Sequence, residues 1–306
     1  MGRLKKNILI IGGSGFIGRN LTEYLQNKFN IFAPPHLQLE LLDEERVRRY
    51  IFANKIQIVI HCANVGGGRD TIRVKDVVYK NLRMFFALTW NLNYLEKIIH
   101  LGSGAEYDKS RPLVKVKEEN FGRQIPQGDY GFAKYVCSRF IENSEKIVNL
   151  RLFAVFGKYE NCYFKFISNS IVKNIFKMPI TVGQNVYFDF MYIDDLLRII
   201  EYFITNEAGH KVYNVASGKR VDLLTIAKLV NKISKYQSKI VVKNPGLNFE
   251  YTANISRLKK EISNFKFTPM TYALRELYSW YAQNIDKIDR SKIVKDEYFK
   301  YIKVKQ

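Results

Sequence analysis

Short apolar runs alternate with longer amphipathic stretches through the first half of the chain. Five runs, at residues 7–11, 31–33, 57–62, 97–101 and 148–153, have the length of a strand and the apolar character that a strand buried on both faces requires. The stretches between them, such as residues 43–53 and 77–94, repeat apolar positions at helical spacing. This order predicts an α/β fold with a doubly wound parallel sheet covered by helices on both faces.

The alternation loosens after about residue 157. Helical patterns follow at residues 164–176, 194–204, 222–234 and 270–284, with one strand pattern at residues 211–216. We therefore expect a large sheet domain made of residues 1–157 and 187–217, and a smaller C-terminal α+β lobe made of residues 158–186 and 218–284. Residues 285–306 are rich in charge, and their pattern predicts strand or coil in a basic, peripheral C-terminal extension.

A glycine-rich segment, GGSGFIG, directly follows the first strand and opens a helical pattern. Gly12 permits a tight turn, Gly15 lets the backbone approach a pyrophosphate, and Gly18 lets the helix pack closely on the strand. The first amides of the helix then face the phosphates. The segment predicts a Rossmann dinucleotide site that includes Gly12, Ser14, Gly15, Phe16, Ile17 and Gly18.

Two further loops leave strands at the same edge of the predicted sheet, where open α/β sheets bind ligands. Cys62, Ala63 and Asn64 follow the strand at residues 57–62, and we assign them to the dinucleotide site. Ser103, Gly104 and Ala105 follow the strand at residues 97–101, and we assign them to a second ligand.

The choice between NAD and NADP is left open by the sequence after the second strand. An NAD site usually has an acidic residue there to bind the ribose 2′-OH, and this chain has Pro34, Pro35 and His36 instead. Arg19 and His36 are the cations that can approach a 2′-phosphate, so we expect NAD or NADP with a slight preference for NADP.

Tyr130 and Lys134 stand four residues apart in the sequence YGFAK, so a helix places both on one face. Asp129 is the predicted N-cap of that helix. A free tyrosine titrates near pH 10 and exchanges protons poorly at pH 7. An ammonium at about 4 Å favours the phenolate by up to roughly 4 kcal/mol at an effective dielectric of about 20. We therefore expect Lys134 to lower the pKa of Tyr130 and make it a proton-transfer group.

The net charge of +20 raises the possibility of nucleic-acid binding. The lysines are scattered along the whole chain and no known nucleic-acid motif is present, so we expect no nucleic-acid partner but attraction of an anionic small substrate.

No apolar run is long enough for a membrane span, and the N-terminus enters a strand, so we expect a cytoplasmic protein with no membrane partner. Three cysteines without CxxC spacing predict reduced thiols and no metal site.

In order and spacing, these motifs resemble the extended short-chain dehydrogenase/reductase family, in its NAD-dependent epimerase/dehydratase branch. The resemblance covers roughly residues 5–284, and NVGGG with HLGSGAEYDK is most similar to GDP-fucose synthase and related 4-ketosugar reductases. It implies a nucleotide-sugar substrate bound by the C-terminal lobe and a homodimer formed through residues 77–94 and 130–145. It also implies that Ser103, Tyr130, Lys134 and Asn81 are catalytic, although Asn81 can equally be a buried hydrogen-bonding residue.

Several positions depart from the family pattern and limit the reaction. Dehydratases of the family place an acid pair after the position of Ser103, where this chain has Gly104 and Ala105, so we do not expect elimination of water. The epimerising cysteine and histidine of GDP-fucose synthases correspond to Ala105 and Lys165. Epimerisation at C3 and C5 is therefore not expected, unless Cys162 or Tyr163 substitutes.

An arginine that clamps the substrate diphosphate in the family is replaced by Phe188. By chain order, another cation must take that role, and Lys165, Lys173, Lys219 and Arg257 are candidates. Together these residues favour an NAD(P)-dependent reductase of a nucleotide-linked 4-ketosugar, for surface polysaccharide synthesis. A 4-epimerase with tightly bound NAD is the alternative, and a non-catalytic dinucleotide sensor is the alternative of another class.

Overall fold

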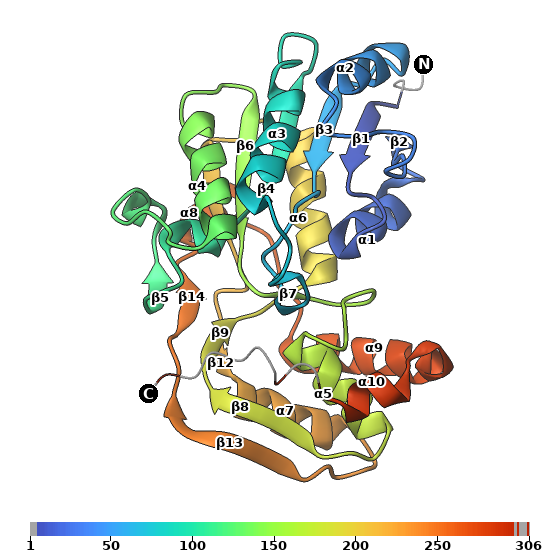
Figure 1. Ribbon diagram of the computed structural model, residues 1–306, viewed down its shortest axis with the longest axis vertical. Coiled ribbons are helices and arrows are strands. Elements are labelled where there is room, and N and C mark those ends of the chain that lie inside the picture. Colours follow the sequence, from blue (N-terminus) through green and yellow to red (C-terminus); the bar gives the residue numbers. More distant parts are fainter. Residues whose placement is uncertain (1–4, 297–298, 300–304, 306) are drawn as a thin grey trace.

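The computed structural model describes residues 5–296, 299 and 305. Within this part of the chain, six strands form one parallel sheet in the order β11-β6-β4-β3-β1-β2 (Figure 1). The strands are β1 Asn7–Ile11, β2 Asn30–Phe32, β3 Ile58–His61, β4 Lys97–Ser103, β6 Ile147–Leu152 and β11 Val212–Val215. The sheet confirms the predicted α/β class.

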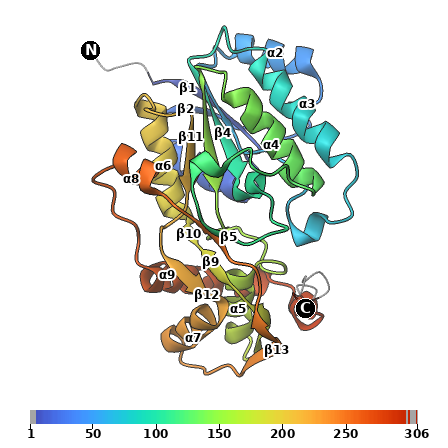
Figure 2. The same cartoon turned by 90° about the vertical axis from the view of Figure 1, so that its left-hand side faces the viewer.

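Helices cover both faces of this sheet, as the views in Figures 1 and 2 show. Side chains of α1 (Phe16–Leu25) and α6 (Ile193–Thr205) pack on one face, in a core that includes Ile8, Ile10 and Ile60. Side chains of α2 (Glu44–Ala53), α3 (Val77–Thr89) and α4 (Asp129–Ile141) pack on the other face, against Leu9 and Val59. Alternate residues of each strand point to opposite faces, so a sheet covered twice needs the continuous apolar runs that the sequence has.

Successive strands are added on opposite sides of β1. Strand β2 pairs with it on one side, and β3 pairs with it on the other. This is a topological switch point, the place where open α/β sheets bind ligands. The glycine-rich segment follows β1, and Cys62 to Gly68 follows β3.

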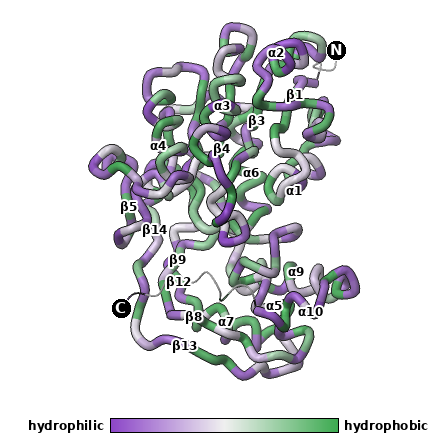
Figure 3. Tube along the Cα trace, in the orientation of Figure 1, coloured by the Kyte–Doolittle hydropathy of each residue, from purple (hydrophilic) through white to green (hydrophobic). Residues whose placement is uncertain are grey.

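A second group of elements lies below the sheet in Figure 1 and has a hydrophobic core of its own. It comprises α5 (Phe166–Ile175), α7 (Leu223–Ile233), α9 (Met270–Gln283), α10 (Arg290–Val294), β8 (Ile180–Asn185) and β13 (Ile240–Leu247). Green hydrophobic and purple hydrophilic residues alternate along its helices in Figure 3, as amphipathic packing requires. The domain boundaries given from the sequence stay a prediction.

Short elements connect the sheet with this second group. They are β5 Leu113–Val116, β7 Val155–Phe156, β9 Tyr187–Asp189, β10 Met191–Tyr192, β12 Arg220–Asp222, β14 Tyr251–Ala253 and α8 Ser256–Glu261, with the 3₁₀ turns η1 Arg69–Thr71, η2 Gly104–Tyr107, η3 Glu118–Asn120 and η4 Ile285–Lys287. Strand β14 pairs with β5 and β9, so it crosses from the lower group to the edge of the sheet domain.

Three local predictions were wrong. The helix expected at residues 77–94 ends at Thr89, because the Asn91 amide donates to the carbonyl of Ala87 and the chain continues as turns. Asp129 lies inside α4, whose N-cap is Gly128. The described part of residues 285–306 contains η4 and α10 rather than strand or coil. It is not peripheral, because Ile293 is buried in the hydrophobic core of the second group of elements. Residues 297, 298, 300–304 and 306 lie outside the described residues.

Candidate active site

The glycine-rich segment has the geometry of a phosphate cradle. Gly12 has φ +81°, and a Cβ there would lie 2.8 Å from the Ala63 amide nitrogen, so the loops after β1 and β3 touch at this point. A Cβ on Gly18 would lie 2.1 Å from the Gly12 carbonyl oxygen, so only glycine lets α1 start this close to β1. Helix α1 starts after Gly15 without a side-chain cap or an acidic residue in its first turn. Its first amides therefore suit an anionic phosphate, and the residues fit a dinucleotide.

The loop after β3 is held by Asn81 of α3. The Asn81 amide oxygen accepts from the Val65 backbone amide at 3.0 Å, and its nitrogen donates to the carbonyls of Val65 and Val77, each at 2.7 Å. These bonds place Gly67 against the Tyr130 ring, since a Cβ on Gly67 would lie 2.8 Å from two ring carbons. Asn81 is therefore a buried hydrogen-bonding residue that holds this loop, and its catalytic role stays a prediction.

Ser103, at the end of β4, is the centre of a small group of hydroxyls. Its side-chain oxygen accepts from the Ala105 amide at 3.1 Å and lies within hydrogen-bonding reach of the phenols of Tyr130 and Tyr251. Gly131 allows α4 to approach this strand end, because a Cβ there would lie 2.8 Å from the Ala105 carbonyl oxygen. The structure therefore brings Ser103, Tyr130 and Ala105 together, as the sequence predicted.

Tyr251, from β14, is a site residue that sequence reasoning missed. A Cβ on Gly104 would lie 2.4 Å from the Tyr251 hydroxyl oxygen, so this hydroxyl fills the space that a larger residue at position 104 would need. The Tyr251 ring packs on Phe153, with centroids 4.8 Å apart, and on Phe188, at 6.0 Å. Glycine at position 104, where the family has an acid, was the sequence signal that a side chain from elsewhere could fill this space. That side chain comes from a strand almost 150 residues later, so the sequence did not identify it.

The expected effect of Lys134 on Tyr130 was wrong for this structure. Burial raises the pKa of Tyr130 to about 12, opposed by the hydrogen bond from Ser103. The Lys134 ammonium donates to the Leu101 carbonyl at 2.8 Å and lies 6.0 Å from the Tyr130 ring centroid. Burial also lowers the pKa of Lys134. The two side chains share a helix face, yet the nearest acceptor for the ammonium is a backbone carbonyl.

A buried ion pair lies directly behind Ser103, and no sequence pattern indicated it. The Arg151 guanidinium donates to the Glu106 carboxylate at 2.5 Å and to the Tyr107 hydroxyl at 2.7 Å. Glu106 in turn accepts from the Ser103 backbone amide at 2.9 Å. Both charged side chains have 1% exposure or less. The pair fixes the turn η2 and therefore the position of Ser103.

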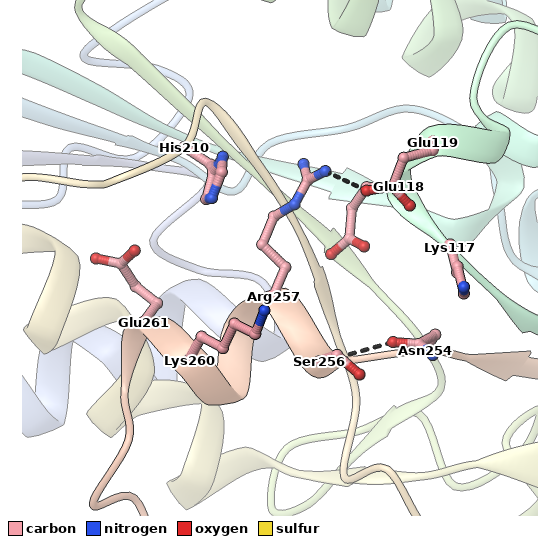
Figure 4. Close-up of a pocket in the computed structure, with 9 residues that line it drawn as sticks. All are labelled: Lys117, Glu118, Glu119, His210, Asn254, Ser256, Arg257, Lys260 and Glu261. Carbon is pink, nitrogen blue, oxygen red and sulfur yellow. Dashed lines mark hydrogen bonds and ion pairs between the residues drawn. The ribbon is translucent and has the colours of Figure 1, made fainter.

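Two of the predicted substrate-binding cations lie elsewhere. Lys173 is buried in α5 and pairs with Asp296 at 2.8 Å, a partner in the C-terminal segment that no sequence pattern indicated. Arg257 of α8 donates to the Glu119 carboxylate, as Figure 4 shows. It also donates to the carbonyl of Val212, on the outer edge strand β11. It lines a separate cavity of about 570 Å³, with β6 and β11 between it and Ser103. Neither residue therefore reaches the site.

The cations proposed to contact a 2′-phosphate have partners as well. The Arg19 guanidinium lies 3.7 Å from the Tyr159 ring centroid, and His36 pairs with Glu40 at 3.0 Å. The geometry therefore adds nothing to the sequence-based preference for NADP.

Within the described ranges, no group of three or more His, Cys, Asp or Glu residues could hold a metal ion. Over the same residues, every helix is too short or too polar to span a membrane.

Residues 8–216 match the family model described as the NAD dependent epimerase/dehydratase family. The chain is 27% identical over 278 residues to dTDP-4-dehydro-6-deoxyglucose reductase of Escherichia coli, covering 78% of this chain and 84% of that protein. Among solved structures, it resembles a GDP-mannoheptose C4 reductase of Campylobacter jejuni with NADP bound, with a TM-score of 0.79 at 18% identity, covering 92% of this chain and 99% of that one. It also resembles a UDP-glucose 4-epimerase of Thermotoga maritima, with a TM-score of 0.78 at 20% identity, covering 91% and 99%.

Because the family model covers more than half of the chain, this protein belongs to the NAD dependent epimerase/dehydratase family. It is an NAD(P)-dependent enzyme with a Rossmann fold.

Proposed function

We propose that this protein is an NAD(P)-dependent reductase of a nucleotide-linked 4-keto sugar, with NADP preferred and with a role in making sugars for surface polysaccharide. The observation that carries the proposal is the meeting of Ser103 and Tyr130 at the sheet edge beside the glycine cradle. The 27% identical reductase supports the same class of reaction.

Each residue has a separate part in the proposed reaction. The glycine-rich segment, Ala63 and Lys134 would hold the dinucleotide. Ser103 donates a hydrogen bond to the reacting carbonyl oxygen. When bound, the nicotinamide supplies a hydride to the carbonyl carbon. Tyr130 gives its phenolic proton to the same oxygen, so the product is an alcohol, and Tyr130 is reprotonated from solvent.

Burial raises the pKa of Tyr130 to about 12, so its phenol is protonated at pH 7. This is the form that a reductase needs before hydride transfer.

Cofactor exchange separates the two reactions. We expect the purified protein to take up NADPH reversibly and to oxidise it when a 4-ketosugar linked to CDP, GDP, UDP or dTDP is added, with absorbance at 340 nm as the measurement. Tightly held NAD that survives gel filtration, with turnover of a nucleotide sugar and no net redox change, would identify the epimerase instead. Binding of dinucleotide without any turnover would identify the sensor.

We expect Tyr251→Phe to lower kcat/KM by about tenfold, because it removes the hydroxyl beside Ser103 and leaves the ring packing intact. Burial raises the pKa of Tyr251 far above neutrality, so the phenol stays protonated and the pH profile of kcat should keep its shape. Steady-state kinetics from pH 6 to 9 test this. A kcat/KM equal to that of the wild type would show that Tyr251 only fills space.

Two further expectations accompany the proposed function. A homodimer would pair α3 and α4 with their copies, and Tyr79, Trp90 and Phe132 are exposed on or just after these helices. We also propose a cytoplasmic location, where nucleotide sugars are made.

A further inference from the structure

The structure leaves open which cations would hold the diphosphate of a nucleotide sugar. Phe188 stands at the position of the usual arginine and packs on Tyr251. Lys173 is paired with Asp296, and Arg257 lies at the outer edge of the sheet. Of the cations considered from chain order, Lys165 is exposed directly before α5, and Lys219 is exposed in the turn before β12.

Another lysine, Lys109, lies against Tyr251, the ring on which Phe188 packs. The Lys109 ammonium is 4.3 Å from the Tyr251 ring centroid, and Phe188 packs on the same ring. Since the Tyr251 hydroxyl touches Gly104 and reaches Ser103, Lys109 lies one side chain away from the proposed reaction centre.

Three segments bring cations together here. Lys109 follows η2, Lys165 precedes α5, and Arg69 opens η1, next to the glycines that cover Tyr130. The Asn161 amide donates to Asp70 at 3.1 Å, which ties η1 to the loop that leads to Lys165. The Lys109 side chain is exposed, yet the surrounding protein and the charges of Lys165 and Arg69 lower its pKa to about 8. Lys165 and Arg69 therefore add positive charge around Lys109.

Among residues 5–296, 299 and 305, neither Lys109 nor Lys165 forms a direct ion pair with a carboxylate. Glu160 is near enough to interact with Lys165 and offsets part of its charge when ionised. Bringing like charges together costs free energy, and a bound anion recovers it. The site is therefore suited to an anion of high charge density.

We propose that Lys109 and Lys165, with Arg69 beside them, bind the diphosphate of the nucleotide-linked substrate, in place of the arginine that Phe188 replaces. This proposal rests on the proposed function. The dinucleotide has a pyrophosphate too, but its cradle is at the start of α1, whereas Lys109 lies against Tyr251 after η2 and Lys165 directly precedes α5.

Binding should depend on pH in a defined direction. Lys109 with a pKa of about 8 is partly neutral in the free protein at pH 8, so an anion should bind with uptake of a proton. The other titratable groups facing the two lysines are Tyr251, which stays protonated, and Glu160, whose pKa is raised by burial to about 7. Ionised Glu160 adds negative charge next to Lys165, so both groups weaken anion binding as the pH rises from 6 to 9.

The test is direct binding of GDP, UDP, CDP and dTDP to the full chain saturated with NADP, by isothermal titration calorimetry. Lys109→Gln and Lys165→Gln should each weaken the tightest of these ligands about tenfold, and the matched control Lys228→Gln, exposed on α7, should not. Affinity for NADP, measured separately, should be unchanged in all three variants. At pH 8 the heat of binding should vary with the ionisation enthalpy of the buffer, because protons are taken up.

The possible failures are distinguishable. Wild-type affinity for the nucleoside diphosphates in both lysine variants would overturn this site and leave the reductase proposal intact. A parallel loss of NADP affinity would also overturn it, because the lysines would then serve the cofactor. If the wild type binds none of the four ligands and oxidises NADPH with none of the ketosugars, the proposed function itself fails.

Discussion

Tyr130→Phe should reduce kcat by about 10³-fold or more while dinucleotide affinity stays within a factor of two to three of the wild type. The substitution removes only the phenolic oxygen, which is the proton donor in the proposed reaction and lies within reach of Ser103. The ring, against which Gly67 packs, is retained, so the loop after β3 keeps its position. Steady-state NADPH oxidation measures the first effect, and quenching of protein fluorescence by NADPH measures the second.

Tyr135→Phe is the matched control for this experiment. Tyr135 lies on the same helix, and its ring packs on Phe121 with centroids 5.0 Å apart, away from Ser103. The control should turn over at the wild-type rate. A Tyr130→Phe enzyme that retains more than a tenth of the wild-type kcat would contradict the assignment of Tyr130 as the proton donor.

The fold was largely predictable because its signals are local. Strands buried on both faces need apolar runs, and Asp43 caps α2 with a side-chain bond to the Arg46 amide, as a sequence pattern can indicate. The glycine segment was equally predictable, because the close contacts of its glycines are local. Gly18 contacts Gly12 in the same segment, and Gly12 contacts Ala63 in the neighbouring loop. Helix ends were predicted less accurately where a single side chain, such as that of Asn91, donates to a backbone carbonyl in place of the next helical amide.

The parts of the site that sequence did not predict all depend on long-range contacts. Tyr251 reaches Ser103 from a strand that pairs with β5 and β9, and its neighbours in sequence carry no motif. Chain order made Lys173 a candidate phosphate ligand, but its ammonium forms an ion pair with Asp296, more than 120 residues away. The position of Lys134 shows the same limit: spacing on a helix fixes which face a side chain lies on, but not which acceptor its ammonium finds.

Arg151→Met should destabilise the protein by about 3–5 kcal/mol, because it leaves the Glu106 carboxylate buried without its cation. Chemical denaturation followed by circular dichroism measures the change. Arg139→Met is the control, since Arg139 forms an exposed pair with Glu142 at 2.7 Å and should change stability little.

The double variant Glu106→Gln with Arg151→Met distinguishes an unpaired charge from a packing defect. Removing both charges eliminates the buried carboxylate, so we expect the double variant to recover much of the stability lost in Arg151→Met. It should recover activity as well, because a glutamine side chain at position 106 keeps an amide oxygen that can accept from the Ser103 backbone amide and hold that residue in place. A double variant as unstable as the single one would show that the loss came from the shape of the Arg151 side chain and its contacts with Tyr107 and Ser138.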